Sequence, residues 1–165
     1  MIGNDIIDLA LAQKESNWKR KGFLDKVFTP REQRLIMNSN NPEIMVWNLW
    51  SRKEAAYKIY SRQSQQRVLI PLQLECFDSG VKEDGIHGTV ICYDATYFTK
   101  TNITSDFVET IAVLQMSDFE KIKPFFDKQK LIKINGIPNY FDERELVLKP
   151  VSKSHHGRFE RMISL

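Results

Sequence analysis

The segment NPEIMVWNLWSRKEAAYKIYSRQ, residues 41–63, constrains the fold more than any other part of the sequence. After Pro42 it contains neither glycine nor proline. Asn41 belongs to the residue types that cap helix starts, and proline suits the first helical position. The segment therefore predicts one long helix, around which the rest of a 165-residue chain must pack. The same start signal recurs at TPREQRLIM, where Thr29 would be the cap of a shorter helix.

The remaining segments are mostly typical of strands. Residues 2–9 (IGNDIIDL) are short and rich in isoleucine, and after Pro71 a series of β-branched and aromatic runs is separated by turn signals. We expect strands within residues 72–77, 88–94, 96–104, 107–115, 130–141, 146–156 and 158–165, with a tight turn at Asn135-Gly136. A short helix is predicted over residues 117–126, capped by Ser117. The order of elements predicts an α+β fold in which antiparallel sheets pack against the long helix.

The composition is that of an ordinary globular protein, 42% hydrophobic and 27% charged. The two cysteines have no metal-binding spacing, so we expect reduced, buried thiols. No apolar run reaches the ~20 residues that span a bilayer. Asp5 and Asp8 interrupt any signal-peptide pattern at the N-terminus. We therefore expect a cytoplasmic protein that does not bind membranes.

Basic residues gather in one part of the chain. The whole chain has a net charge of only +3, whereas residues 14–34 contain seven basic and three acidic side chains. Such a segment suits an acidic partner or phosphates, although a solvated helix face would look the same. No DNA- or RNA-binding motif accompanies the charge, so we do not expect nucleic acid as a partner.

Three acidic residues stand out as candidates for chemistry. Glu54 and Lys58 are four residues apart in the predicted long helix and share a face, as a simple surface ion pair would. Glu32, in the shorter helix, would most often be a solvated side chain. Asp5 lies in an isoleucine-rich strand, where a carboxylate is costly unless it binds a cation or hydrogen-bond donors. A structural role in a cap or turn is the alternative for Asp5.

Taken in order, IGNDIIDL, FTPREQRL and WSRKEAAYK resemble the signature of the 4′-phosphopantetheinyl transferase superfamily. The third part is matched by Trp50, Lys53, Glu54 and Lys58. The resemblance covers residues 1–77 well and residues 88–115 more loosely. It implies a single domain over residues 1–165, with a possible pseudo-twofold arrangement in which residues 1–115 form the catalytic half.

The tail SKSHHGR resembles a strand that precedes the catalytic strand in the larger, surfactin-type members of the superfamily. Here it comes last, so the chain resembles a circular permutation of those enzymes. Close termini make such a rearrangement tolerable. Residues 116–165 would then complete the coenzyme A site within the same chain, whereas the small synthases build their sites between subunits.

The resemblance implies Mg²⁺-dependent transfer of 4′-phosphopantetheine from coenzyme A to a serine of an acidic acyl or peptidyl carrier protein. Asp5 and Glu54 match the metal-binding carboxylates, and either Glu54 or Lys58 would take the serine proton. The residues matched to the strand that cradles the coenzyme A 3′-phosphate are Ser154, His155 and Arg158, with Lys153 as a further cation. The departures at Ile7, where an acid can stand, and at Ile137, where a lysine is usual, leave open a catalytically degenerate module that only binds coenzyme A or a carrier protein.

Overall fold

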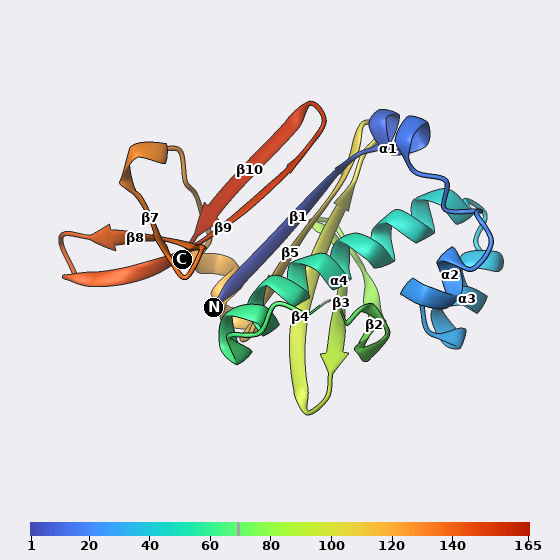
Figure 1. The fold of residues 1–165 in the computed structure, drawn as a ribbon, viewed down its shortest axis with the longest axis horizontal. Coiled ribbons are helices and arrows are strands. Elements are labelled where there is room, and N and C mark those ends of the chain that lie inside the picture. Colours follow the sequence, from blue (N-terminus) through green and yellow to red (C-terminus); the bar gives the residue numbers. More distant parts are fainter. Residues whose placement is uncertain (69) are drawn as a thin grey trace.

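Two five-stranded antiparallel sheets lie side by side in the computed structural model, which describes residues 1–68 and 70–165 (Figure 1). The predicted α+β class is confirmed. The first sheet has the order β1-β5-β4-β3-β2. Its strands are β1 (Ile2–Asp8), β2 (Leu74–Lys82), β3 (Gly85–Cys92), β4 (Ala95–Ile103) and β5 (Phe107–Val113). Leu69 lies outside the described residues.

The long helix α4 (Pro42–Ser64) packs across the first sheet, and its start is the predicted one. The Asn41 side chain accepts a hydrogen bond from the Ile44 amide, and Pro42 occupies the first turn. The helix lies very close to β1 at Gly3, where a Cβ atom would run into the backbone carbonyl oxygen of Ala55. Glycine at this position is therefore what lets α4 approach the first strand.

Three shorter helices, α1 (Leu9–Glu15), α2 (Phe23–Val27) and α3 (Pro30–Met37), follow β1 and lead back to α4. Thr29 caps α3 as predicted. It forms a reciprocal capping box with Glu32, in which each side chain bonds to the backbone amide of the other residue. Helices α2 and α3 lie beside the N-terminal end of α4 (Figure 1).

The second sheet has the order β6-β10-β9-β8-β7. Its strands are β6 (Lys123–Pro124), β7 (Leu131–Ile134), β8 (Ile137–Asp142), β9 (Val147–His156) and β10 (Phe159–Ser164). The predicted turn at Asn135-Gly136 joins β7 to β8. The short 3₁₀ helices are η1 (Pro71–Gln73), η2 (Met116–Lys121) and η3 (Lys128–Lys130).

The helix predicted over residues 117–126 is wrong. Only the 3₁₀ helix η2 forms there, preceded by Gln115 rather than capped by Ser117, and β6 then pairs with β10. Pro124 explains the difference, because proline lacks an amide hydrogen and disfavours a helical residue before it.

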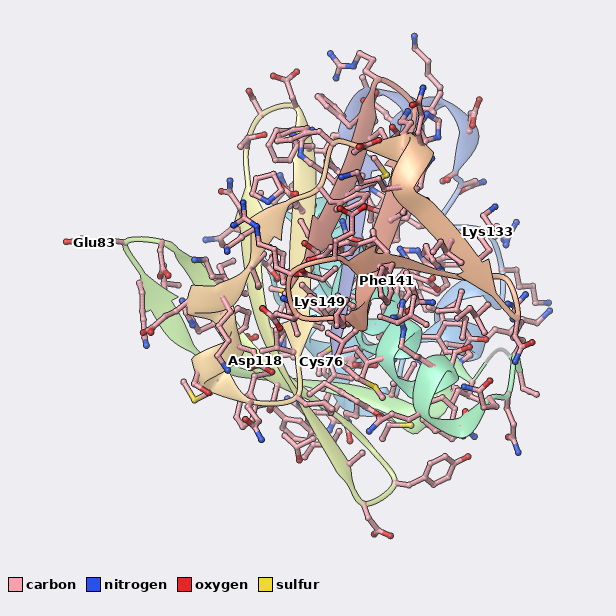
Figure 2. All side chains as sticks on the ribbon, turned by 90° about the vertical axis from the view of Figure 1, so that its left-hand side faces the viewer. Cys76, Glu83, Asp118, Lys133, Phe141 and Lys149 are labelled. Atoms are coloured by element: carbon pink, nitrogen blue, oxygen red, sulfur yellow. The ribbon has the colours of Figure 1, made fainter. Side chains whose placement is uncertain are left out.

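The two sheets differ in how they are covered. All four α-helices lie with the first sheet, and the second sheet extends away from them (Figure 1). Large apolar side chains are consequently exposed on and beside the second sheet: Phe126, Ile132, Ile134, Phe141 and Leu148. Figure 2 looks onto this part of the molecule and labels Phe141. Across the described ranges, no helix has the length and apolar character needed to cross a membrane.

Candidate active site

The outer edge of β1, on the side away from β5, is covered by side chains rather than by another strand. The Asn4 amide donates to Ser152 Oγ at 2.9 Å, and the Asp8 amide donates to His156 Nδ1 at 2.9 Å. Both acceptors belong to β9. Side chains of this strand therefore satisfy two amides on the β1 edge.

Asp5 of β1 and Lys58 of α4 meet where the long helix packs against this strand. Lys58 Nζ donates to the Asn4 carbonyl oxygen at 2.5 Å and lies 3.7 Å from Asp5 Oδ1. The Asp5 side chain is largely buried, with 16% of its surface exposed. Two residues predicted from separate parts of the sequence are thus brought together at one strand edge.

The carboxylates here carry negative charge that the protein compensates only in part. Burial raises the pKa of Asp5 to about 6; the Lys58 ammonium lowers it and the charge of Glu54 raises it. Burial also raises the pKa of Glu54, against a lowering by Lys58. The predicted Glu54–Lys58 surface pair is not a separate ion pair, since Lys58 contacts Asp5 instead.

These carboxylates fit a hard divalent cation. Mg²⁺ prefers oxygen ligands and commonly uses one or two carboxylates together with phosphate and water. Burial raises the pKa of both carboxylates, so a cation near either one would favour its charged form. Among the described residues there is no group of three or more histidine, cysteine, aspartate or glutamate side chains placed to hold a metal. Asp5 and Glu54 are the protein groups that would hold it.

Glu32, expected to be solvated, is fully buried. Its Oε2 atom lies 2.6 Å from Lys53 Nζ, and its Oε1 atom accepts the Cys76 amide at 2.9 Å. Lys53 Nζ also donates to the carbonyl oxygens of Val27 and Pro71 at 2.9 and 2.7 Å. Two residues of the recognised signature are therefore structural, joining α3, α4 and β2. The capping box between Thr29 and Glu32 explains why Glu32 stands in the first turn of α3. This local pattern does not reveal the buried pairing of Glu32 with Lys53.

A cavity of about 180 Å³ lies beside Lys58, between the C-terminal part of α4 and the second sheet. Four cationic side chains line it: Lys58, Arg62, Arg67 and Lys153. Arg62 donates to the Val151 carbonyl oxygen at 2.9 Å, while its buried Nε atom has no partner in the described part of the chain. The cavity is suited to anions such as phosphates.

The predicted tail residues take different positions around this cavity. Ser154 Oγ accepts the Asn4 side-chain amide at 2.9 Å, and His155 is exposed. Lys153 lines the cavity and pairs with Glu160 Oε2 at 2.8 Å. The described lining includes Lys153 but neither Ser154 nor His155.

Arg158 is held by Asp8 and is not part of the described cavity lining. Its backbone amide and Nε both donate to Asp8 Oδ2, at 3.0 and 2.9 Å, and Nη2 donates to Oδ1 at 3.0 Å. These bonds hold the pKa of Asp8 well below its usual range. Asp8 also caps α1, so it does not join Asp5. The phosphate-binding roles of Ser154, His155 and Arg158 stay predictions.

The basic segment of residues 14–34 lies at the other end of α4 from this cavity. Arg31 in it makes structural contacts, because Nε pairs with Glu75 at 3.3 Å and the guanidinium donates to the Cys76 carbonyl oxygen. The remaining basic side chains are exposed: Lys14, Lys19, Arg20, Lys21, Lys26 and Arg34.

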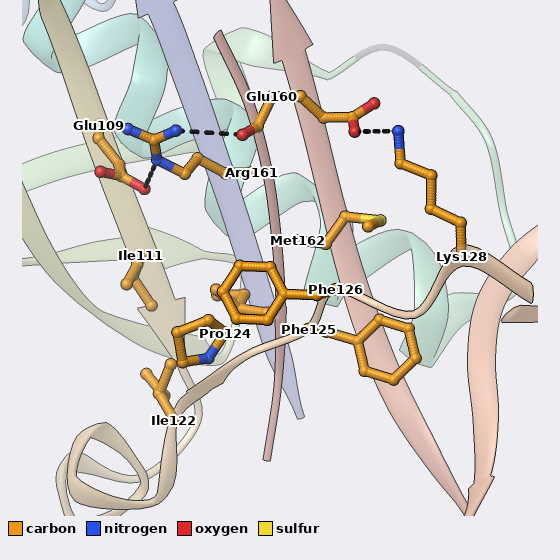
Figure 3. Close-up of a pocket in the computed structure, with 11 residues that line it drawn as sticks. Glu109, Ile111, Ile122, Pro124, Phe125, Phe126, Lys128, Glu160, Arg161 and Met162 are labelled. Atoms are coloured by element: carbon orange, nitrogen blue, oxygen red, sulfur yellow. Dashed lines mark hydrogen bonds and ion pairs between the residues drawn. The ribbon is translucent and has the colours of Figure 1, made fainter. Parts of the chain in front are cut away.

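A larger cavity, of about 520 Å³, lies between β5, β6 and β10 (Figure 3). Its walls are mainly apolar, and two ion pairs stand at one side, Glu109–Arg161 at 3.3 Å and Glu160–Lys128 at 2.5 Å. None of the predicted site residues is in its described lining. The cationic cavity beside Lys58 is therefore the one that adjoins the candidate site.

Comparison with known proteins identifies the family and finds a similar fold. A family model described as the 4′-phosphopantetheinyl transferase superfamily matches residues 1–112. A holo-[acyl-carrier-protein] synthase from Natranaerobius thermophilus is 29% identical over 93 residues, which cover 54% of this chain and 72% of the relative. The crystal structure of the Helicobacter pylori holo-[acyl-carrier-protein] synthase in complex with coenzyme A is similar in fold, with 17% identity and a TM-score of 0.51, and the match covers 70% of this chain and all of that one.

Proposed function

The chain belongs to the 4′-phosphopantetheinyl transferase superfamily, and on that premise we propose that it transfers 4′-phosphopantetheine from coenzyme A to a serine of an acyl or peptidyl carrier protein. One observation carries the proposal. Asp5, Glu54 and Lys58 converge at the β1 edge, beside a cavity lined by further cations. The similarity to a holo-[acyl-carrier-protein] synthase supports the same reaction.

Asp5 and Glu54 hold the Mg²⁺ ion in this proposal. When bound, such an ion neutralises charge on the phosphoryl oxygens and on the leaving group. The protein itself supplies the ligands in a partly buried place, where ionic attraction is stronger than in bulk water.

Glu54 and Lys58 have different tasks. The serine oxygen attacks the β-phosphorus of coenzyme A, and the bond to the adenosine 3′,5′-bisphosphate leaving group breaks. We assign the serine proton to Glu54, because a carboxylate has oxygen lone pairs beyond those that it gives to a metal, whereas the Lys58 ammonium, which pairs with Asp5, has no acceptor. Lys58, held by the Asn4 carbonyl, directs its positive charge toward the phosphates.

The cavity beside Lys58 takes the phosphates of coenzyme A. Lys153, Arg62 and Arg67 are placed to meet them, with Ser154, His155 and Arg158 assigned to the 3′-phosphate from the family resemblance. For Ser154 and Arg158 this role requires sharing or exchanging their present bonds to Asn4 and Asp8. Residues 116–165 would thus complete the site within one domain and one chain.

The exposed basic side chains of residues 14–34 dock the carrier protein in this proposal. An acidic carrier would meet them at the N-terminal end of α4, away from the coenzyme A cavity, so both substrates can bind together. A carrier protein of fatty acid biosynthesis in the cytoplasm is the partner to test first.

A degenerate binding module is the second candidate, because Ile7 and Ile137 lack the polar groups that stand there in surfactin-type enzymes. Intact-mass spectrometry of an apo carrier protein, incubated with this protein, coenzyme A and Mg²⁺, separates the two. A transferase adds the mass of phosphopantetheine, and Asp5→Asn abolishes the addition. Binding of coenzyme A without any added mass over a range of carrier proteins would identify the module instead.

A further inference from the structure

We propose that Ser152, on β9, is a positioning residue for Lys58 and acts through Asn4. The inference rests on the proposed function for its effect on turnover, but the contacts that carry it do not. A residue of the second sheet would thus help to position Asp5 and Lys58, which lie on β1 and α4 beside the first sheet.

Ser152 and Asn4 are joined by two reciprocal hydrogen bonds. The Ser152 hydroxyl accepts the Asn4 backbone amide at 2.9 Å and donates to Asn4 Oδ1 at 2.7 Å. Both residues are buried, with 3% and 0% of their surfaces exposed. Since a hydroxyl has a single hydrogen to donate, the Ser152 donor is committed to Asn4 and is not free for a ligand in the cavity that Ser152 also lines.

Asn4 links Ser152 to Lys58 and Asp5. Its carbonyl oxygen is the acceptor for Lys58 Nζ, and Asp5 is the next residue in the strand. One residue, Asn4, therefore connects the Ser152 hydroxyl to the lysine and to the neighbouring carboxylate.

Arg62 closes the arrangement from the other side. It lies one turn beyond Lys58 on α4 and donates to the carbonyl oxygen of Val151, the residue before Ser152. The contacts run from Lys58 on α4 to Asn4 on β1, then to Ser152 on β9, and from Val151 back to α4 through Arg62. The Lys58 ammonium is thus held in a ring of three elements, and Ser152 supplies one of the links between the two sheets.

Removing the Ser152 hydroxyl should release Lys58 without removing any residue assigned to bind coenzyme A. For Ser152→Ala we expect kcat to fall about tenfold, equivalent to about 1.4 kcal/mol, with KM for coenzyme A changed less than about twofold. The matched control is Ser164→Ala, which removes a buried hydroxyl from β10 of the same sheet. We expect wild-type kinetics for the control.

A second readout does not depend on activity. The Lys58 amine is labelled with an acetylating reagent, and the modified peptide is quantified by mass spectrometry. Ser152→Ala should raise the labelling rate of Lys58 several-fold, because the Asn4 carbonyl that accepts from the ammonium is then held less firmly, while Ser164→Ala should leave the rate unchanged. If Ser152→Ala does not fold, the similarly shaped pair Ser152→Thr and Ser152→Val replaces it, and only the valine variant should raise the labelling.

The outcomes separate this inference from the proposed function. Unchanged Lys58 labelling in folded Ser152→Ala, or an equal rise in Ser164→Ala, would overturn the positioning role. Raised labelling, specific to loss of the Ser152 hydroxyl, in a protein whose wild type transfers nothing would support the positioning role and reject the transferase. A rise in KM for coenzyme A with unchanged kcat would also overturn it, because Ser152 would then be a binding residue.

Discussion

Lys53 and Lys58 lie five residues apart on α4, and each pairs with a carboxylate. The two pairs have opposite surroundings. Lys53 belongs to a closed junction, formed by Glu32, Lys53 and their backbone partners, in which both side chains are 1% exposed or less. Lys58 belongs to an open edge, formed by Asp5, Glu54 and Lys58, in which the Lys58 side chain is 30% exposed.

The difference lies in what remains uncompensated. In the closed junction each charge has an opposite charge and further hydrogen bonds, so a ligand would gain nothing there. At the open edge, burial raises the pKa of both carboxylates, and the single Lys58 ammonium opposes this by lowering both pKa values. A lysine–carboxylate pair on this helix is therefore structural where other protein groups pair with every charge. It is available for a ligand where some charge is left without a partner.

The largest expected effect separates the two lysines by stability. Lys53→Met leaves Glu32 as an unpaired buried carboxylate and should cost about 3–5 kcal/mol of unfolding free energy. Lys58→Met, at the partly exposed position, should cost less than about 1 kcal/mol while removing transferase activity. Denaturant unfolding of both variants tests this. Equal destabilisation would show that the two regions do not differ as described.

The next effect separates the carboxylates by activity. Glu54→Gln keeps the side-chain shape and removes the charge, so turnover should fall at least about 10²-fold, on the order of 3 kcal/mol of transition-state stabilisation. Glu43→Gln, in the first turn of the same helix, is the control and should keep its rate. Near-normal turnover of Glu54→Gln in excess EDTA would exclude the assigned metal site.

Asp5→Asn should abolish transferase activity and raise the unfolding free energy of the metal-free protein. Because the folded pKa of about 6 exceeds the ordinary 3.8, the stability contributed by Asp5 is fully present below about pH 4 and is lost as the pH rises through about 6. Asparagine carries no such penalty, so the variant should be up to about 3 kcal/mol more stable at pH 7. The gain should shrink toward zero at pH 4 in thermal or denaturant unfolding. A gain independent of pH would contradict the assigned pKa.

The smallest effect concerns the carrier protein. Reversing Lys21 and Arg34 to glutamate should raise KM for the carrier about 3- to 10-fold and weaken its salt dependence, since exposed charges each contribute modestly. KM for coenzyme A should not change. The control reverses Lys130 in η3 and Lys133 in β7, both exposed. If the control raised KM for the carrier equally, the docking surface would not be the basic segment.

Local signals in the sequence predicted the helices best. The caps at Thr29 and Asn41 fix helix starts through neighbouring backbone groups, so the starts of α3 and α4 followed directly from the sequence. The helix predicted over residues 117–126 failed because Pro124 outweighed a weak cap at Ser117.

The site depended on information that is not local. Asp5, Glu54 and Lys58 were assigned through the family resemblance, since spacing alone favoured a surface pair for Glu54 and Lys58. The burial of Glu32 with Lys53 and the bonds of Ser152 to Asn4 join residues far apart in the chain. Such contacts arise from packing, which no local pattern encodes.

A pH titration of the Asp5 carboxyl carbon by ¹³C NMR tests most directly whether the open edge holds uncompensated charge that a cation can relieve. The Asp5→Asn spectrum identifies the signal. In the metal-free protein the midpoint should lie near pH 6, and added Mg²⁺ should move it to lower pH, because the cation favours the ionised carboxylate. A midpoint near 3.8, or one that Mg²⁺ leaves unchanged, would contradict this description of the site.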